Sequence, residues 1–553
     1  MNQISAQTSI TRPRPVAADD ALDRLTFLGW RWGLAAIVAG LATSFFLLGY
    51  ALVYWRNADM DFMVIYNAFL LNDGKPQQFF DHTAYITIVT AKFWFQLLHA
   101  LGLLDAWSLS AIPSASNLPA FEAAMTSAVR AGRLLALMTA VGCVLAFATL
   151  FRWMIRDGRI ALLATVAFTF SGGMAIHSRI LRSELLAACP VIFALLILIA
   201  LGRRAGAWRP LGIAIAAGLC VLGLENKVQA ILLIGALPIL VLPFGSAESA
   251  SVPFWRSRSA WLAAAVAAVA AIAAAWVVWP LAETAFEPEL LDVVHFHPLL
   301  LGRFGVYQTA LLLLIGGCMI IYAAIWRISA AETLASMAAL AAGAMLALLV
   351  LNIEYSAINV RNINMVAVFH PLEKMLTFAD SNTTDVANDS SWSGILSLLL
   401  HGVGSVLARY SFVLHPSPRP AVFLAWLSVA GVVVAWRRDR RLAAMQALLL
   451  LLTAIAIDAI GVSRGLKAEY FIFTDPLIIL AAAILLDALN FLRFHKWTIP
   501  VAMMLLSLHI AGSQAEPLKS AFSHRGPESI CHWNRHYLPL LPLPWCALPP
   551  VRP

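Results

Sequence analysis

Runs of about 17 to 25 mainly apolar residues recur along the whole chain and restrict its possible folds more than any other feature. A helix of ~20 residues crosses the ~30 Å hydrocarbon core of a bilayer, and it satisfies its own backbone hydrogen bonds there. Because 61% of the residues are hydrophobic and only 12% are charged, the chain has far more apolar surface than a soluble core needs. The sequence therefore predicts an all-α polytopic membrane protein.

We count about thirteen such runs, whose positions predict the topology. They fall near 33–55, 130–151, 160–176, 184–201, 210–224, 228–244, 260–280, 304–326, 332–352, 419–436, 442–462, 470–490 and 497–512. No secretory cleavage pattern follows the first run, so we expect it to remain as an anchor. With the N-terminus in the cytoplasm, Lys and Arg concentrate in the cytoplasmic segments, which supports an N-in, C-out topology. The net charge of +8 is then a topology signal, and no nucleic-acid partner is expected.

The chain reads as one membrane domain with external additions. Residues 1–32 form a cytoplasmic segment, 33–512 the transmembrane domain, and 513–553 an external tail; 56–129 and 353–418 are large external loops. Within the first loop, residues 84–104 are apolar with polar residues at helical spacing, which predicts an amphipathic helix in the membrane interface. Since most cytoplasmic loops are short, we expect any chemistry on the outer face of the inner membrane.

Two carboxylates, Asp59 and Asp61, follow the first apolar run in the stretch W-R-N-A-D-M-D. A polar loop leaving a membrane explains them as well as an active site does, if spacing is the only evidence. Their interpretation therefore depends on what else lies on the same side of the membrane.

A second polar cluster, H-S-R-I-L-R-S-E, occupies residues 177–184 before the fourth run. Arg179 and Arg182 are three apart and are predicted to share a helix face, where together they would hold a phosphate. His177 is a further candidate. The alternative is that Ser183 caps the helix and Glu184 complements its dipole.

Two further clusters are expected on the outer side. Glu225 and Lys227 lie in a very short turn, where Lys227 is either a phosphate ligand or an interfacial anchor. Arg361 and His370 lie in the large late loop, where a solvated loop is the better interpretation. No Gly-rich nucleotide loop or hydrolase motif is present, so neither a nucleotide sugar nor ATP is expected as a substrate.

Four of the six cysteines lie in apolar runs and are expected to be small core residues; they are Cys143, Cys189, Cys220 and Cys318. Cys531 and Cys546 lie instead in the tail, without the His/Cys spacing of a zinc site. An external compartment is oxidising, so we predict a disulfide between them.

The order of these motifs resembles that of the GT-C membrane glycosyltransferases. The resemblance rests on the acid pair after the first span, R-L-L-A-L at 133–137, H-S-R-I-L-R-S-E at 177–184 and G-L-E-N-K-V-Q at 223–229. It covers roughly residues 30–245. The branch it most resembles contains the protein O-mannosyltransferases and the aminoarabinose transferases.

The resemblance implies an inverting transfer of a sugar from a polyprenyl-phosphate donor to a glycan, lipid or protein acceptor. Asp59 or Asp61 would be the general base, and Arg179, Arg182 and Lys227 would stabilise the leaving phosphate. Some members of the family bind a divalent metal with these acids and others do not.

Two alternatives stay open. A lipid-linked glycan ligase or polymerase would depend on the late loop with Arg361 and His370, and a transporter would need repeats and broken helices.

Overall fold

The computed structural model describes residues 16–56, 58–78, 84–155, 157–202, 208–245, 258–284, 304–358, 368–371, 392–410, 421–461, 468–489, 498–522, 527, 531, 537–541 and 543–546. Every helix or strand element in these ranges is a helix. The α-helices are α1 (Val16–Phe45), α2 (Ala58–Asn72), α3 (Tyr85–Ala100), α4 (Leu118–Met154), α5 (Gly158–Thr169), α6 (Gly172–His177), α7 (Glu184–Gly202), α8 (Trp208–Asn226), α9 (Ala230–Val241), α10 (Arg258–Thr284), α13 (Phe304–Ile325), α14 (Ala330–Ala357), α17 (Trp392–Arg409), α18 (Val422–Arg437), α19 (Arg441–Gly461), α20 (Asp475–Ala488) and α22 (Thr498–Phe522). The all-helical prediction is confirmed for these ranges.

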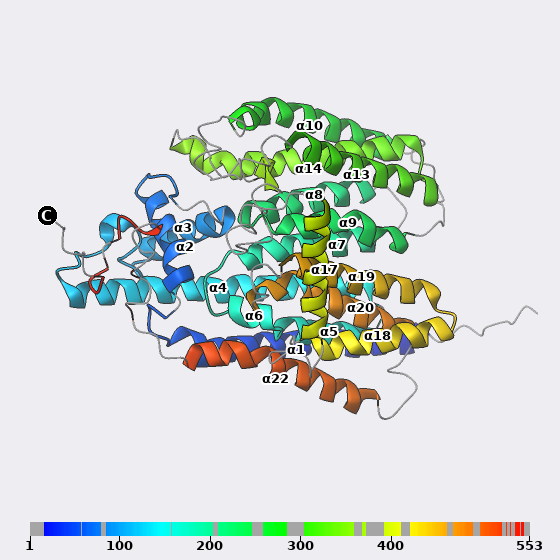
Figure 1. Cartoon of the computed structure of the whole chain (residues 1–553), viewed down its shortest axis with the longest axis horizontal. Coiled ribbons are helices and arrows are strands. Elements are labelled where there is room, and N and C mark those ends of the chain that lie inside the picture. The colour runs from blue at the N-terminus through cyan, green and yellow to red at the C-terminus, as the bar shows by residue number, and fades with distance from the viewer. Residues whose placement is uncertain are drawn as a thin grey trace, which may run out of the picture.

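Most of the long helices lie roughly side by side, and α17 crosses them steeply (Figure 1). Six described helices are long and apolar enough to cross a membrane: Gly29–Tyr50, Leu118–Met154, Glu184–Gly202, Arg209–Asn226, Ala330–Ala357 and Arg441–Ile460. Four shorter apolar helices accompany them: Gly158–Thr169, Ala230–Phe244, Leu313–Ile325 and Val422–Arg437. The chain is thus a helical membrane protein, and the predicted number of thirteen spans stays a prediction.

Several helix bounds differ from the ends of the predicted apolar runs. The first apolar helix ends in a π-helical turn, Phe46–Tyr50, and α2 begins at Ala58, so Asp59 and Asp61 lie in a helix and not in a loop. The helix that contains the second apolar run begins at Leu118, inside the predicted loop, because Asn117 caps it and Pro lies at its start. At the other end, α22 continues to Phe522, well past residue 512.

The helix predicted for residues 84–104 is confirmed as α3. It buries one face, formed by Tyr85, Ile88, Ala91 and Phe95, whose spacing is that of an amphipathic helix. Ile88, Ala91 and Phe95 pack against α2, whereas the Tyr85 ring lies against Tyr355 of α14, and α3 also contacts α8. The helix is therefore part of the packed bundle end and covers α2.

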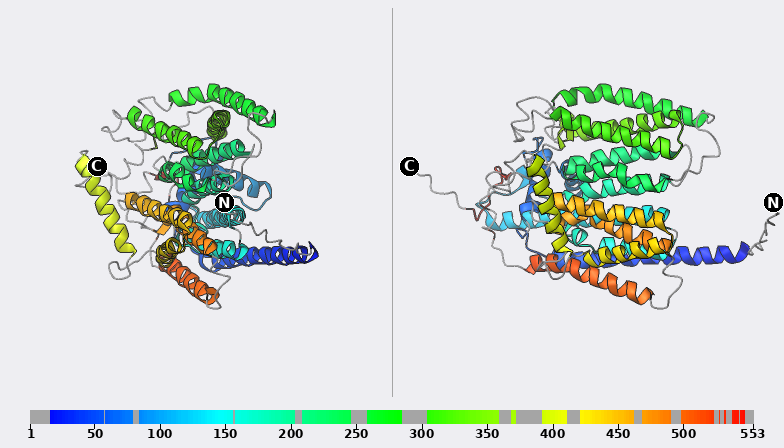
Figure 2. Two further views of the ribbon diagram at one scale, coloured as in Figure 1. Left: turned by 90° about the vertical axis from the view of Figure 1, so that its right-hand side faces the viewer. Right: turned by 45° about the vertical axis from the view of Figure 1, so that its right-hand side comes forward.

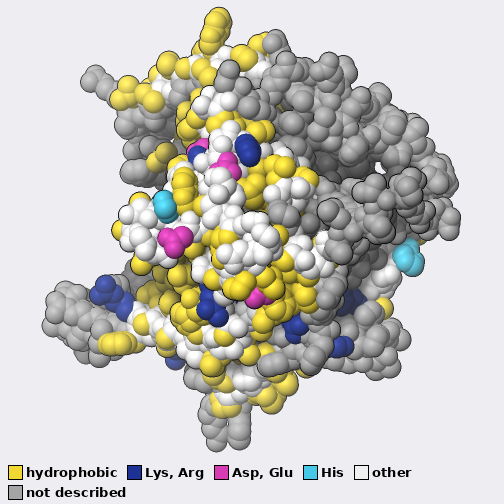
Figure 3. All heavy atoms as spheres, turned by 90° about the vertical axis from the view of Figure 1, so that its left-hand side faces the viewer, with side chains coloured by type: hydrophobic (Ala, Val, Ile, Leu, Met, Phe, Trp, Pro, Cys, Tyr) yellow, Lys and Arg dark blue, Asp and Glu magenta, His cyan; other side chains and the backbone are white. Residues whose placement is uncertain are grey.

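One end of the bundle collects the elements that carry the predicted site. α2 and α3 lie there together with the C-terminal segment (Figures 1 and 2). The C-terminus of α8 reaches the same end, since the Asn226 carbonyl oxygen accepts a hydrogen bond from the Ala84 N–H at 2.9 Å. Viewed onto this end, the described surface mixes apolar and polar side chains with a few separated charges (Figure 3).

Candidate functional site

Asp61 is completely buried and forms an ion pair with Arg133 of α4, which is also completely buried. The Arg133 Nε donates to Asp61 Oδ2 at 3.0 Å, while Asp61 Oδ1 accepts the Leu181 N–H at 3.0 Å. Both carboxylate oxygens are therefore used inside the protein. This arrangement makes Asp61 the residue that joins α2 to α4 and to the segment before α7.

The Arg133 guanidinium also holds the chain where the first apolar helix ends. It donates to the carbonyl oxygens of Gly49, Leu52 and Val53 at 3.4, 2.6 and 3.2 Å. The Gly49 and Val53 carbonyls also accept the Leu52 and Arg56 N–H groups at 3.4 and 3.2 Å, so the buried guanidinium adds a further donor to each of them. A π-helical turn is rare and is frequently found at functional sites.

The segment 178–183 is a turn, which corrects the prediction that Arg179 and Arg182 share a helix face. α6 ends at His177 and α7 begins only at Glu184, so the two arginines point to different neighbours. The turn is fixed from the α2 side by the Leu181 N–H bond to Asp61. One short segment therefore joins the acid-bearing helix to the buried Arg179 and to Arg182, whose side chain is 9% exposed.

Arg179 lies between the first apolar helix and α22, and it is only 6% exposed. Its Nη2 donates to Ser44 Oγ at 2.6 Å and to Gln514 Oε1 at 2.8 Å, while Nε and Nη1 have no hydrogen-bond partner among the described residues. Gly49 allows this close packing, because a Cβ there would lie 3.0 Å from the Arg179 Cβ. Burial lowers the pKa of Arg179 to about 10, so its side chain stays charged at neutral pH.

Arg182 and Lys227, by contrast, both bind Glu184. Arg182 forms a bidentate pair with Glu184 at 2.9 and 3.2 Å and reaches Glu469 at 3.5 Å, and Lys227 pairs with the same Glu184 carboxylate. The Lys227 Nζ also lies 5.0 Å from the centre of the Tyr470 ring. Two cations are thus balanced by two carboxylates at the junction of α7, α8 and the short helix Ala468–Phe473.

His177 lies at the edge of this charged cluster and is buried. Its Nε2 lies 3.1 Å from the Glu469 carbonyl oxygen, which it reaches as a donor in the neutral tautomer. Burial is the main cause that lowers the His177 pKa to about 4. His177 is therefore neutral near pH 7 and adds no charge to the cluster.

The short turn predicted around Lys227 is confirmed between α8 and α9. Asn226 organises it: its Oδ1 accepts the Thr87 N–H and hydroxyl at 3.1 Å each, and its Nδ2 donates to the Leu186 carbonyl oxygen at 3.0 Å. Glu225 precedes it inside α8, completely buried, and neither of its carboxylate oxygens has a hydrogen-bond partner among the described residues.

The disulfide between Cys531 and Cys546 is confirmed, and the other four cysteines are free thiols. The tail it closes packs directly onto α2 and its neighbours: Leu538 and Leu541 are buried in the cluster that holds Phe62 and Ile65. The Trp545 ring contacts the rings of Tyr54, Trp55 and Phe121 at 5.9 to 6.3 Å between centroids. The tail therefore covers the helix that carries the acid pair.

Some predicted residues lie outside the described part of the chain, namely Arg361 and most of the loop 353–418. The same holds for the side chain of Asp59, although its backbone belongs to α2. His370 is described and buried. Within the described ranges, no three His, Cys, Asp or Glu side chains gather as a metal site would require.

Arg133, Gln514 and Glu469 have central contacts here, but the sequence did not single them out as site residues. Arg133 carried a usable signal, because a charge inside a long apolar helix requires a partner. No sequence signal marks Gln514 or Glu469 as a site residue, because their contacts join segments that are hundreds of residues apart.

No family model, curated protein or solved structure matches this chain.

Proposed function

We propose that the protein is an inverting glycosyltransferase that moves a sugar from a polyprenyl-phosphate donor to a glycan, lipid or protein acceptor. The observation that carries this proposal is Arg179, a buried cation with no carboxylate partner among the described residues. Two of its nitrogens, Nε and Nη1, have no hydrogen-bond partner among the described residues. Burying a charge without a counter-ion is costly, so an anion is the natural ligand of this site.

The surroundings of Arg179 favour an anion that arrives from the bilayer. Phe46 and Leu47 of the π-helical turn are 51% and 74% exposed, and Leu508 of α22 is exposed as well. α22 and α1 lie side by side in the bundle (Figures 1 and 2). A lipid phosphate can approach between such apolar surfaces, whereas a nucleotide sugar cannot.

Each of these residues has a role in the proposed reaction. Asp59 takes the proton of the acceptor hydroxyl, whose oxygen forms the new bond to the anomeric carbon as the bond to the phosphate oxygen breaks. Arg179 stabilises the charge that grows on the leaving phosphate. Asp61 holds α2 against Arg133, and thereby positions Asp59 relative to the donor. Arg182 and Lys227 keep the turn in place through Glu184.

The test reconstitutes the purified protein with radiolabelled polyprenyl-phosphate sugars and follows release of the lipid phosphate. Hydrogen bonds to a charged group contribute ~1.5–3 kcal/mol, so Arg179→Gln should lower kcat/KM by roughly 10- to 150-fold. Arg179→Lys should retain part of the activity, because it keeps the charge and loses the planar fork.

Arg159→Gln is the matched control, since Arg159 is a surface cation of α5 whose side chain is 63% exposed. Its activity should equal that of the wild type. Wild-type activity in Arg179→Gln, or turnover with nucleotide sugars alone, would overturn the proposal. A folded Arg361→Ala variant without activity, beside an active Arg179→Gln, would indicate the ligase class instead.

A further inference from the structure

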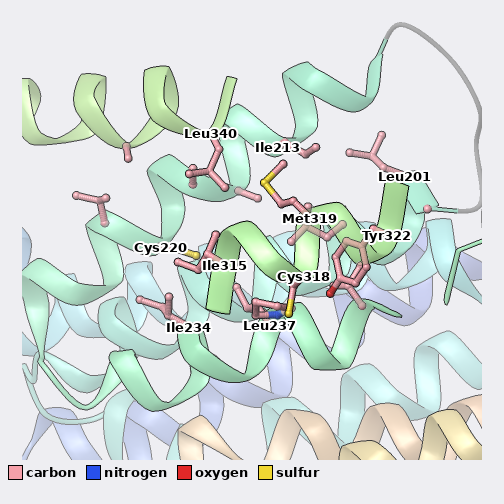
Figure 4. Close-up of a pocket in the computed structure, with 18 of the residues that line it drawn as sticks. Leu201, Ile213, Cys220, Ile234, Leu237, Ile315, Cys318, Met319, Tyr322 and Leu340 are labelled. Atoms are coloured by element: carbon pink, nitrogen blue, oxygen red, sulfur yellow. The ribbon is translucent and has the colours of Figure 1, made fainter. Parts of the chain in front are cut away.

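A long apolar cavity lies between α7, α8, α9, α13 and α14 (Figure 4). Its volume is about 330 Å³. One face of α13 lines it with Ile315, Cys318, Met319 and Tyr322, whose spacing of three and four residues is that of a single helical stripe. Apolar cavities of roughly half this size stay dry and bind apolar ligands.

The cavity has the length of a lipid chain. On α8 its lining runs from Arg209 to Leu224, which corresponds to ~22 Å of helix at ~1.5 Å per residue. That is most of the ~30 Å hydrocarbon core. Spread over this length, 330 Å³ leaves room for a single extended chain.

Two hydrogen-bond donors at one end of the cavity are unused. Arg209 and Tyr322 both line the cavity, and the Arg209 Nε and the Tyr322 hydroxyl are buried atoms without a hydrogen-bond partner among the described residues. Figure 4 shows the Tyr322 hydroxyl directed toward Cys318, which is another lining residue. Leaving a buried donor unpaired is costly, so this end favours a ligand that supplies an acceptor.

The charge of this end decides which kind of acceptor fits. The Arg209 Nη1 donates to Glu332 Oε1 at 2.8 Å, so the guanidinium already has its counter-ion. Glu332 is fixed in the first turn of α14, where its N–H donates to the capping Ser329 hydroxyl. An added anion would lie beside the Glu332 carboxylate, whereas a neutral carbonyl oxygen accepts from both donors without adding charge.

The opposite end of the cavity is apolar and points toward the candidate site. Among the described lining residues it is formed by Val221, Leu224 and Val368. From there α8 continues to Asn226, which lies at the end of the bundle that holds α2 and α3. The polar end is therefore on the other side of the bundle, and the stacked Tyr322 and Trp326 rings there are typical of a membrane interface.

We propose that this cavity binds one acyl chain of a bilayer glycerolipid, whose ester carbonyl accepts hydrogen bonds from the Tyr322 hydroxyl and the Arg209 Nε. The ester groups of a glycerolipid lie where the hydrocarbon meets the head groups, and the donor end of the cavity lies where α8 and α14 begin. The lipid belongs to the leaflet on the side away from α2 and α3. The cavity is separate from Arg179, so the proposal does not rest on the proposed function.

Binding is measured on the full-length protein in detergent with three radiolabelled ligands of equal chain length: hexadecane, methyl hexadecanoate and hexadecanoate. The ester should bind roughly 5- to 150-fold more tightly than hexadecane, which corresponds to two neutral hydrogen bonds. Hexadecanoate should bind no more tightly than the ester, because the Glu332 carboxylate lies beside the head group. Equal binding of hexadecane and the ester, or tighter binding of hexadecanoate, would overturn the assignment of the head group.

Tyr322→Phe tests the head group by removing only the hydroxyl. Affinity for the ester should fall roughly 2- to 12-fold, the effect of one neutral hydrogen bond, while affinity for hexadecane should stay the same. Tyr54→Phe is the control, since it also removes a buried hydroxyl without a described partner, but outside this cavity. Equal loss of both ligands in Tyr322→Phe, or loss of neither, would contradict the role of Tyr322.

Matched substitutions on one helix locate the site. Ala217→Phe fills the cavity and should abolish binding of all three ligands, whereas Ile215→Phe, at a surface position of the same helix, should leave it unchanged. Ala344→Phe fills the cavity from α14 and serves if Ala217→Phe does not fold. Unchanged binding in a folded cavity-filling variant would refute the site.

The lipids extracted from the purified protein identify the natural occupant. A glycerolipid should co-purify with the wild type and with Ile215→Phe, and it should be depleted from Ala217→Phe. Depletion of a polyprenyl phosphate in the same comparison would refute the glycerolipid and assign the cavity to the donor of the transferase. Depletion of neither lipid would refute the site, and the Arg179 experiment would keep its own outcome in each case.

Discussion

Asp61→Asn is the substitution that best separates a structural role of the acid pair from a catalytic one. Asp61 and Arg133 are both 0% exposed, and their contact is a 3.0 Å charge-assisted hydrogen bond. Removing one member of a buried ion pair costs ~3–5 kcal/mol, because the other charge stays buried without compensation. Arg133 keeps its three carbonyl acceptors, so we expect the lower end of this range, about 3 kcal/mol.

The free energy of unfolding in mixed micelles measures this loss, which corresponds to roughly a 150-fold change in the unfolding equilibrium. Asp73→Asn is the control. Asp73 accepts hydrogen bonds from the Ser110 N–H and hydroxyl at an exposed position. In Asn the carbonyl oxygen still accepts the N–H and the amide NH2 donates to the hydroxyl oxygen, so the change should stay within ~0.5 kcal/mol. The double variant Asp61→Asn with Arg133→Gln should recover at least ~1 kcal/mol relative to the sum of the single changes.

The sequence interpretation predicts a different result, in which Asp59→Asn and Asp61→Asn both fold normally and at least one of them loses ~10² in kcat, as a general base would. A stability within ~0.5 kcal/mol of the wild type together with that loss of activity would refute the structural role given to Asp61. Asp59→Asn should show the catalytic pattern, with unchanged stability and kcat lower by ~10².

The remaining predictions concern the charged cluster and the tail. Glu184→Gln should destabilise the protein by ~3–5 kcal/mol, because it leaves Lys227 and Arg182 without the counter-ion that they share. Thermal unfolding in detergent measures this loss. An unchanged melting temperature would show that the cluster does not stabilise the fold. The lowered pKa of His177, about 4, means that only the unfolded state binds a proton between pH 6.5 and 4. The free energy of unfolding should therefore fall by about 3 kcal/mol as the pH drops through this window, and His177→Gln should abolish this part of the pH dependence. The same pH dependence in the variant and in the wild type would contradict the role of His177. Reducing the Cys531–Cys546 disulfide should cost ~3 kcal/mol of tail stability in the chain-entropy model and expose the tail to protease. Without reductant, these two cysteines should not react with a thiol reagent in denatured protein while the other four do, and labelling of all six would contradict the disulfide.

The sequence by itself determined the class of fold and the positions where polar groups interrupt apolar ones. Apolar runs long enough to cross a bilayer indicate helices whatever their neighbours are, because the backbone has no other way to satisfy its hydrogen bonds in hydrocarbon. The turn around Lys227 and the cysteine pair in the tail are local features of the same kind. They depend on residues close in the chain, so pattern alone predicted them.

Only the tertiary structure decided which charges are paired. Arg179, Arg182 and Lys227 looked equivalent in the sequence, yet Glu184 binds two of them and Arg179 has no carboxylate partner among the described residues. Whether a buried cation is balanced depends on side chains from distant helices, such as Gln514 against Arg179. The role of Asp61 likewise depends on Arg133, 72 residues away, because the cost of a buried charge is set by its nearest partner and not by its own sequence context.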